Sequence, residues 1–70
     1  MKINNRGLEP PQPMVRILQA LEELKDGEEL IAINDRQPMF LYAELNERGF
    51  DYETISQDDG SYKIIIQKKG

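Results

Sequence analysis

Residues 14–33, MVRILQALEELKDGEELIAI, decide the fold of this 70-residue chain because they predict a helix followed by a central strand. In the first part of the stretch, apolar residues recur at the spacing of an amphipathic helix: Met14, Ile17, Leu18, Leu21 and Leu24. We expect this helix to end at Asp26-Gly27, where the glycine supplies the left-handed conformation that is common after helices. Residues 30–33 are apolar on both faces, which is typical of a central strand that is covered on at least one side.

The flanking segments extend an alternating order of elements. Residues 2–5 predict a short strand, and the proline-rich segment RGLEPPQP at residues 6–13 leads into the first helix. Residues 34–38 start a second helix, and Gly49 ends it. Its apolar stripe at i, i+3, i+4 and i+7 consists of Pro38, Leu41, Tyr42 and Leu45.

The last third of the chain predicts an antiparallel hairpin. Residues 52–57 and 62–68 have the composition of strands, and residues 58–61, DDGS, form a strong turn signal between them. Right-handed crossovers then place both helices on one face of a four-stranded mixed sheet. We therefore expect an α+β fold, a two-layer α/β sandwich of order β-α-β-α-β-β, as one domain over residues 1–70.

One face of this sheet is expected to remain uncovered. Strand alternation places Ile64 and Ile66 on one face of the last strand and Ile65 on the other. Together with Ile31 or Ala32 from the central strand, Ile65 leaves apolar surface for a partner. A homodimer through the uncovered sheet face is one such pairing.

The composition excludes several kinds of chemistry. The chain has no cysteine, histidine or tryptophan, which removes thiol nucleophiles, imidazole bases and Cys/His zinc sites. We expect no catalytic activity, no metal and no cofactor. Nine Lys+Arg against thirteen Asp+Glu give a net charge of −4, which disfavours nucleic acid and anionic membranes as partners. No apolar run is long enough to span a membrane, and we expect a cytoplasmic location.

The segment at residues 6–13 resembles the signature that opens TusA/SirA-like sulfur-carrier proteins. In that family an Arg-Gly-Leu segment leads to Cys-Pro-x-Pro at the start of the first helix, and the element order is similar over nearly the whole chain. Pro11 and Pro13 occupy the two proline positions, and Pro10 stands where the sulfur-carrying cysteine would be. The resemblance implies a TusA-like fold, but the thiol on which sulfur transfer depends is absent.

A closer likeness is to an uncharacterised bacterial branch of the same superfamily, which reads Arg-Gly-Leu-x-Pro-Pro-x-Pro-Met. That branch also carries an Asp-Arg-x-Pro loop, here residues 35–38, and an Arg-Gly-Phe, here residues 48–50. Some relatives have histidine where this chain has Asn34, so a metal or haem role that rests on the histidine does not carry over. The likeness implies membership of the branch and supplies no function.

Topology indicates where a binding site would lie. If the first two strands are parallel, residues 6–13 and 34–38 lie at the same edge of the sheet, where open α/β sheets bind ligands. Two helix N-termini, with Arg6 and Arg36 beside them, would suit a small anion or a partner carboxylate. The alternative is structural: Arg6 and Arg36 pair with Glu9 and Asp35, and Asn34 or Asp35 caps the second helix.

Two apolar residues near this edge also have two interpretations. Phe40 and Met39 lie off the buried stripe and could contact a partner, since exposed aromatic and methionine side chains are enriched where proteins meet. Alternatively a rotated helix tucks one of them into the core; for Met39 we expect the core position. Met14 with Met39 could form a soft Cu(I) site, but core packing explains two thioethers better.

These observations give two hypotheses of function. The first is a non-catalytic protein-interaction or adaptor module that keeps the docking surface of its superfamily without the thiol chemistry. The alternative is a sensor of a small anion or metabolite that uses the paired helix N-termini. The residues expected to bind a partner or ligand are Arg6, Gly7, Glu9, Pro10, Pro11, Pro13, Asp35, Arg36, Gln37 and Phe40.

Overall fold

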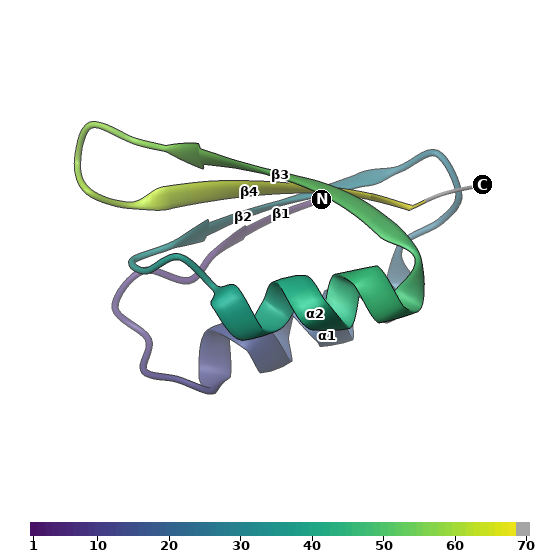
Figure 1. Cartoon of the computed structure of the whole chain (residues 1–70), viewed down its shortest axis with the longest axis horizontal. Coiled ribbons are helices and arrows are strands. Elements are labelled where there is room, and N and C mark those ends of the chain that lie inside the picture. Colours follow the sequence, from purple (N-terminus) through teal and green to yellow (C-terminus); the bar gives the residue numbers. More distant parts are fainter. Residues whose placement is uncertain (69–70) are drawn as a thin grey trace.

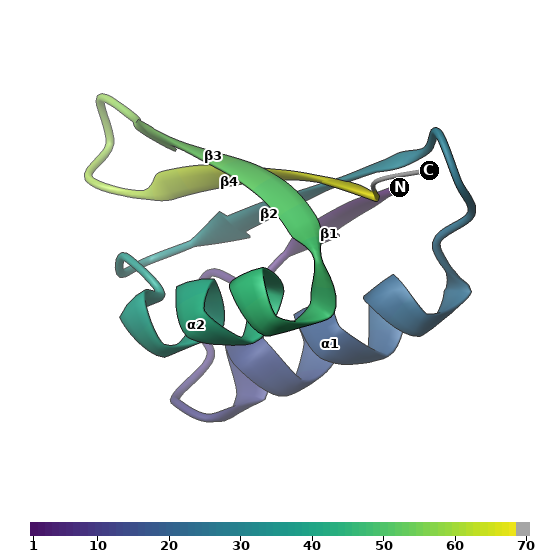
Figure 2. The ribbon, with the colours of Figure 1, turned by 45° about the vertical axis from the view of Figure 1, so that its right-hand side comes forward.

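The computed structural model describes residues 1–68 and has the expected alternation of strands and helices. The elements are β1 (Lys2–Asn4), α1 (Gln12–Glu23), β2 (Glu29–Asn34), α2 (Met39–Arg48), β3 (Phe50–Ser56) and β4 (Tyr62–Lys68). One sheet has the order β1-β2-β4-β3, in which β1 and β2 are parallel and the other neighbours antiparallel. Both helices cover the same face of the sheet (Figures 1 and 2), which confirms the two-layer α+β fold. Within residues 1–68, neither helix is long and apolar enough to cross a membrane.

The core lies between the helices and the covered face of the sheet. Register pairs Leu30 with Ile66 and Ala32 with Ile64, so these four side chains line up on that face, as strand alternation predicted for β4. The helices add the other buried aliphatic residues: Ile17, Leu21, Leu24, Leu41 and Leu45. Because so few residues form this core, the loss of any one of them removes a sizeable part of the apolar burial.

The two helices end differently. Gly49 follows α2 in the left-handed conformation with φ 78°, and its N–H donates to the carbonyls of Asn46 and Leu45, as predicted. The predicted end of α1 was wrong: the helix stops at Glu23, and Leu24 is already extended. Leu24 is only 2% exposed, so burying it in the core takes the chain off the helix before Gly27 is reached.

The boundaries of β2 and β3 also differ from the predicted ones. β3 begins at Phe50, directly after the helix-ending glycine, because its backbone already pairs there with the end of β4. Tyr52 on this strand stacks on Tyr42 of α2, with ring centroids 4.8 Å apart. The Tyr42 hydroxyl also makes a hydrogen bond with the Thr54 hydroxyl. These contacts fix α2 against the edge strand of the sheet.

One of the two residues predicted to share the uncovered face with Ile65 does lie on that face. Ala32 is fully buried in the core, whereas Ile31 lies on the opposite face and is paired in register with Ile65. Ile31, not Ala32, therefore contributes the apolar surface of the uncovered face.

Candidate functional site

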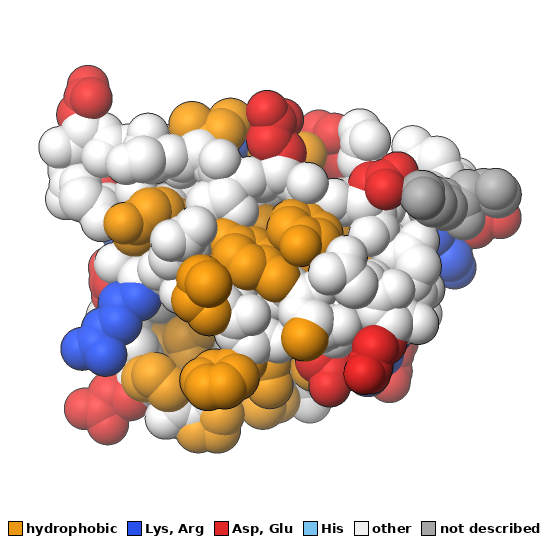
Figure 3. All heavy atoms as spheres, viewed as in Figure 1, with side chains coloured by type: hydrophobic (Ala, Val, Ile, Leu, Met, Phe, Trp, Pro, Cys, Tyr) orange, Lys and Arg blue, Asp and Glu red, His pale blue; other side chains and the backbone are white. Residues whose placement is uncertain are grey.

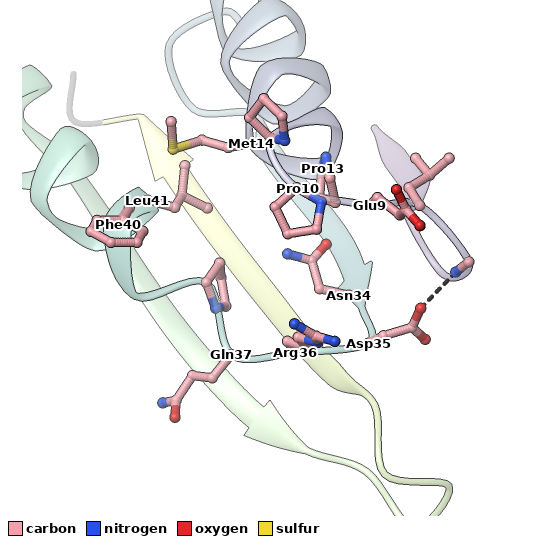
Figure 4. Close-up of a pocket in the computed structure, with 14 residues that line it drawn as sticks. Glu9, Pro10, Pro13, Met14, Asn34, Asp35, Arg36, Gln37, Phe40 and Leu41 are labelled. Carbon is pink, nitrogen blue, oxygen red and sulfur yellow. Dashed lines mark hydrogen bonds between the residues drawn. The ribbon is translucent and has the colours of Figure 1, made fainter.

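A groove of about 390 Å³ lies where the first two parallel strands end and the two helices begin. Every residue expected to bind a partner or ligand lines this groove, except Arg6. The lining residues are Gly7, Leu8, Glu9, Pro10, Pro11, Pro13, Met14, Asn34, Asp35, Arg36, Gln37, Pro38, Phe40 and Leu41 (Figure 4). The parallel pairing of β1 with β2 brings the two loops together, since both strands lead into the same edge of the sheet.

The walls of the groove are largely apolar. Met14 and Leu41 belong to the two helices and pack with the core, and the prolines of both loops form much of the remaining wall. Phe40 lies on the rim with 86% of its surface exposed, so the interpretation that tucks it into the core was wrong. Figure 3 shows hydrophobic side chains gathered at the end of the molecule where both helices begin, bordered by charged ones. Volume and lining are typical of a binding site rather than a packing defect.

Met39 does not occupy the core position that we predicted for it, because it is 64% exposed. Helix α2 buries Leu41 and Leu45, and residues one and two positions before Leu41 point about 100° and 200° away from that buried direction. The first turn of α2 therefore presents two large apolar side chains to solvent beside the groove.

A pair of buried asparagines lies under the groove and determines which side-chain atom of Asn34 faces it. Asn5 is 1% exposed and Asn34 is 3% exposed. The side-chain amide nitrogen of Asn5 donates to the Pro13 carbonyl at 3.3 Å and to the Asn34 Oδ1 at 3.0 Å. A carbonyl can only accept a hydrogen bond, so the Asn5 side-chain atom that faces the Pro13 carbonyl must be the amide nitrogen. Because this nitrogen also faces Asn34, the Asn34 atom on that side must be the oxygen.

It follows that the Asn34 atom facing the groove is its amide nitrogen. In Figure 4 this nitrogen points into the space between Pro10 and Leu41. Within residues 1–68, it has no hydrogen-bond partner. Among residues 1–68, the buried side-chain atom that lacks a partner is Asn5 Oδ1, not this nitrogen. The groove therefore offers an accessible amide donor to an acceptor atom of whatever enters it.

The charged residues pair differently from the structural alternative stated above. Arg6 forms an ion pair with Asp59 of the β3–β4 turn at 2.9 Å, not with Glu9. Asp35 accepts a hydrogen bond from the Gly7 N–H at 2.6 Å, which links the two loops at the groove. Among the described residues Arg36 has no ion pair, so the predicted pairing with Asp35 was wrong.

The predicted cap of α2 was also wrong. Pro38 stands at the N-cap without a side-chain cap, because the Asn34 and Asp35 side chains are held in the contacts just described. Local carbonyls use much of what the helix starts could offer an anion. The Met39 and Leu41 N–H groups donate to Gln37 and Pro38, at 3.0 Å each.

The first turn of α1 is similarly occupied. The N–H of Gln12 donates to the Glu9 carbonyl at 2.9 Å, and that of Val15 donates to the Pro11 carbonyl at 3.0 Å. Pro13 has no N–H at all. Both helix starts therefore have fewer amide donors for an anion than the sequence led us to expect.

The groove residues can bind but carry few groups that react. The lining includes two carboxylates, one guanidinium and two side-chain amides, and no hydroxyl, thiol or amine nucleophile. Among residues 1–68, no three His, Cys, Asp or Glu side chains gather where they could hold a metal ion. The groove residues can therefore contact a ligand through hydrogen bonds, charge and apolar surface.

The sequence analysis missed Asn34 as a donor to the groove. A signal was present, because Asn34 continues the core-facing alternation of Leu30 and Ala32, and Asn5 continues that of Ile3. A polar residue at a core-facing strand position must find a partner. The local sequence could not show that this partner is a second asparagine 29 residues away.

The comparisons with known proteins agree with this fold. A family model described as "Uncharacterized conserved protein (DUF2249)" matches residues 2–68. Among solved structures, a SirA-like protein from Desulfitobacterium hafniense is similar, with a TM-score of 0.88 and 24% identity over 99% of this chain and 97% of that chain. This likeness shows a SirA-like fold. No curated protein matches the chain.

Proposed function

The chain belongs to the family of uncharacterized conserved proteins DUF2249, and on that premise we propose that it is a non-catalytic protein-interaction module. A segment of a partner protein docks in the groove and against the exposed Phe40. The observation that carries the proposal is the combination of an apolar groove with an amide donor at Asn34 that has no hydrogen-bond partner among residues 1–68.

The rim supports a protein partner. Phe40 is 86% exposed at the start of a helix whose next residue is fully buried, so an anchored backbone presents a large aromatic side chain at the edge of the groove. Burying such a side chain on binding gives a large apolar gain with little loss of side-chain freedom. Met39, 64% exposed on the same turn, enlarges the contact.

The polar groups indicate what the docked segment presents. The Asn34 amide nitrogen matches a backbone carbonyl, which every extended peptide carries. Arg36, without an ion pair among residues 1–68, matches an acidic side chain of the segment. An apolar residue next to that acidic one would contact Met14 and Leu41.

The closer sequence resemblance fits this function. Residues 7–11 and Pro13 form one wall of the groove, and Pro10 lies at the position of the cysteine in the sulfur-carrier signature. We infer that this chain, like the uncharacterised branch that it resembles, keeps the docking surface and has exchanged the reactive thiol for an inert ring.

The alternative, a sensor of small anions, has less support. Its main donors would be the N–H groups of the two helix starts, and most of these donate to local carbonyls or are absent at proline. What still favours it is the pairing of the Asn34 donor with the Arg36 guanidinium, which a carboxylate could contact together.

The experiment that tests the proposal places a photo-crosslinking amino acid at position 40 in cells that produce the protein. Mass spectrometry identifies the adduct, and calorimetry then measures the affinity of the purified partner for wild type, Phe40→Ala and Arg36→Glu. We expect each substitution to weaken binding by about 1–2 kcal/mol, roughly tenfold, because rim aromatic and arginine residues dominate interface energies.

Two matched variants serve as controls. Ile55→Ala removes an exposed apolar side chain from the opposite face of the sheet, and Lys25→Glu reverses an exposed charge just beyond the C-terminal end of α1. Both should leave the affinity unchanged. The proposal is wrong if Phe40→Ala and Arg36→Glu bind the partner as tightly as these controls do.

A further inference from the structure

The uncovered face of the sheet carries a row of four side chains, one from each strand. Register pairs Lys2 with Ile31, Ile31 with Ile65, and Ile65 with Glu53. The row therefore reads cation, isoleucine, isoleucine, carboxylate from β1 to β3. The helices lie on the other side of the sheet (Figure 1) and leave this row uncovered.

A second row beside it continues the apolar strip. It consists of Asn4, Ile33, Lys63 and Ile55, aligned by the same three strand pairings. Ile55 is 41% exposed. Isoleucines from three strands thus gather on this face, with Lys63 of β4 between Ile33 and Ile55 in the second row.

The charges at the two ends of the first row cannot neutralise each other within one chain. Lys2 and Glu53 lie on opposite edge strands, three strand spacings or about 14 Å apart. Both are exposed, and within residues 1–68 neither forms an ion pair. Each is therefore available to a group on another molecule.

We propose that this face pairs with the same face of a second copy of the chain. A two-fold axis in the interface, running along the strands between β2 and β4, exchanges the two edges of the sheet. It places Lys2 over Glu53 of the second copy, and Ile31 over Ile65 of the second copy. One residue row thus supplies two ion pairs around a central layer of four isoleucines.

The charge pattern selects this axis over the other in-plane choice. An axis across the strands through the same row would place Lys2 over Lys2 and Glu53 over Glu53. Like charges opposed at an interface cost several kcal/mol. Of these two axes, only the one along the strands makes the first row complementary to itself.

The size of the face sets the expected strength of the pair. Four strands at about 4.8 Å and six residues at about 3.3 Å give a face of about 400 Å² per copy. That is half of the roughly 800 Å² per partner of a standard interface, so the dimer forms only at high protein concentration. The groove residues take no part, and a dimer would present two docking grooves at once.

Sedimentation velocity from micromolar to millimolar protein tests the proposal directly. We expect a concentration-dependent dimer of wild type that Lys2→Glu or Glu53→Lys alone weakens by about tenfold or more. The double variant Lys2→Glu/Glu53→Lys restores association, because the swapped charges meet again across the axis. Both residues are exposed, so these variants keep the fold, which circular dichroism checks.

Two results would overturn the inference. One is a wild-type chain that remains monomeric at millimolar concentration. The other is a dimer that both single charge reversals leave unchanged, or that the double variant fails to restore, since either would assign the association to another surface. Neither outcome bears on the groove, which is tested with a different partner and different residues.

Discussion

Two segments at the same end of the sheet, the β3–β4 turn and the groove, differ in whether their polar groups have hydrogen-bond partners. In the β3–β4 turn, the Ser61 hydroxyl and N–H both donate to Asp59, the Gln57 side-chain amide lies 2.9 Å from the Ser61 hydroxyl, and Arg6 pairs with Asp59. In the groove, Asn34 keeps an amide donor without a partner, and Phe40 is exposed on the rim. Register places Asn34 directly opposite Tyr62, so the two segments are neighbours.

The difference indicates which of the two neighbours is built to bind. A turn whose donors and acceptors satisfy one another has little to offer a partner. A groove with an apolar wall and an unpaired amide donor can contact both the apolar and the polar groups of an incoming segment. We interpret the turn as structure and the groove as the interaction site.

The largest expected effect comes from removing the support beneath the groove. Asn5→Ala leaves the Pro13 carbonyl and the Asn34 oxygen without their donor and opens a small void. We expect a loss of about 2–4 kcal/mol in the free energy of unfolding, measured by urea denaturation. The matched exposed variant Asn46→Ala, at a side chain with no hydrogen bond among the described residues, should lose no more than about 0.5 kcal/mol. Equal losses in the two variants would contradict a structural role for the asparagine pair.

A smaller effect is expected in the turn. Gly60 has φ 87° there, a conformation that costs a residue with a Cβ about 1–2 kcal/mol. Gly60→Ala should therefore destabilise the protein by about that amount while the groove keeps its binding. Loss of partner binding at unchanged global fold would show that the turn and the groove are not independent.

The turn also predicts a pH dependence. Hydrogen bonds from the Ser61 hydroxyl and N–H, together with Arg6, lower the pKa of Asp59 below its ordinary value of 3.8. A carboxylate with a lowered folded-state pKa stabilises the protein above its unfolded pKa, and this contribution is lost as pH falls through the folded value. Wild type should therefore exceed Asp59→Asn in stability at pH 7, and the difference should shrink below pH 3.8. An unchanged difference at the lowest pH would rule out this origin.

The smallest effect on stability is expected at Arg36, although its effect on binding is large. Among the described residues it has no ion pair to lose, so Arg36→Glu should change the free energy of unfolding by less than about 0.5 kcal/mol. Thermal unfolding and partner affinity measured on the same sample separate the two effects. A large loss of stability would place Arg36 in the structure instead of the interface.

The comparison also explains what the sequence could predict. The turn at residues 58–61 is local, and its residues alone predicted it. The parallel β1–β2 pair confirms that residues 6–13 and 34–38 meet at the same edge of the sheet, as the sequence predicted. The predicted partners of Arg6 and Asp35 were wrong, because the partners seen in the structure lie 53 and 28 residues away along the chain.

The remaining errors have the same physical origin. The end of α1 depends on burying Leu24, and the exposure of Met39 depends on how α2 is rotated against the sheet. Helical periodicity gives the apolar face but not the rotation to within one residue, and Met39 lies at the start of the helix where the core does not reach. Tertiary packing, not local preference, determined both positions.

The most direct test of the groove as a docking site is an amide correlation spectrum of isotope-labelled protein titrated with capped leucine, N-acetyl-leucine N′-methylamide. This neutral probe carries one apolar side chain and backbone carbonyls, and inorganic phosphate is titrated in parallel. The account predicts saturable shifts of the Asn34 side-chain amide and of the Met14 and Leu41 backbone amides with capped leucine, while residues 57–61 stay unchanged. Shifts with phosphate alone, or no saturable shift at Asn34 with either probe, would contradict it.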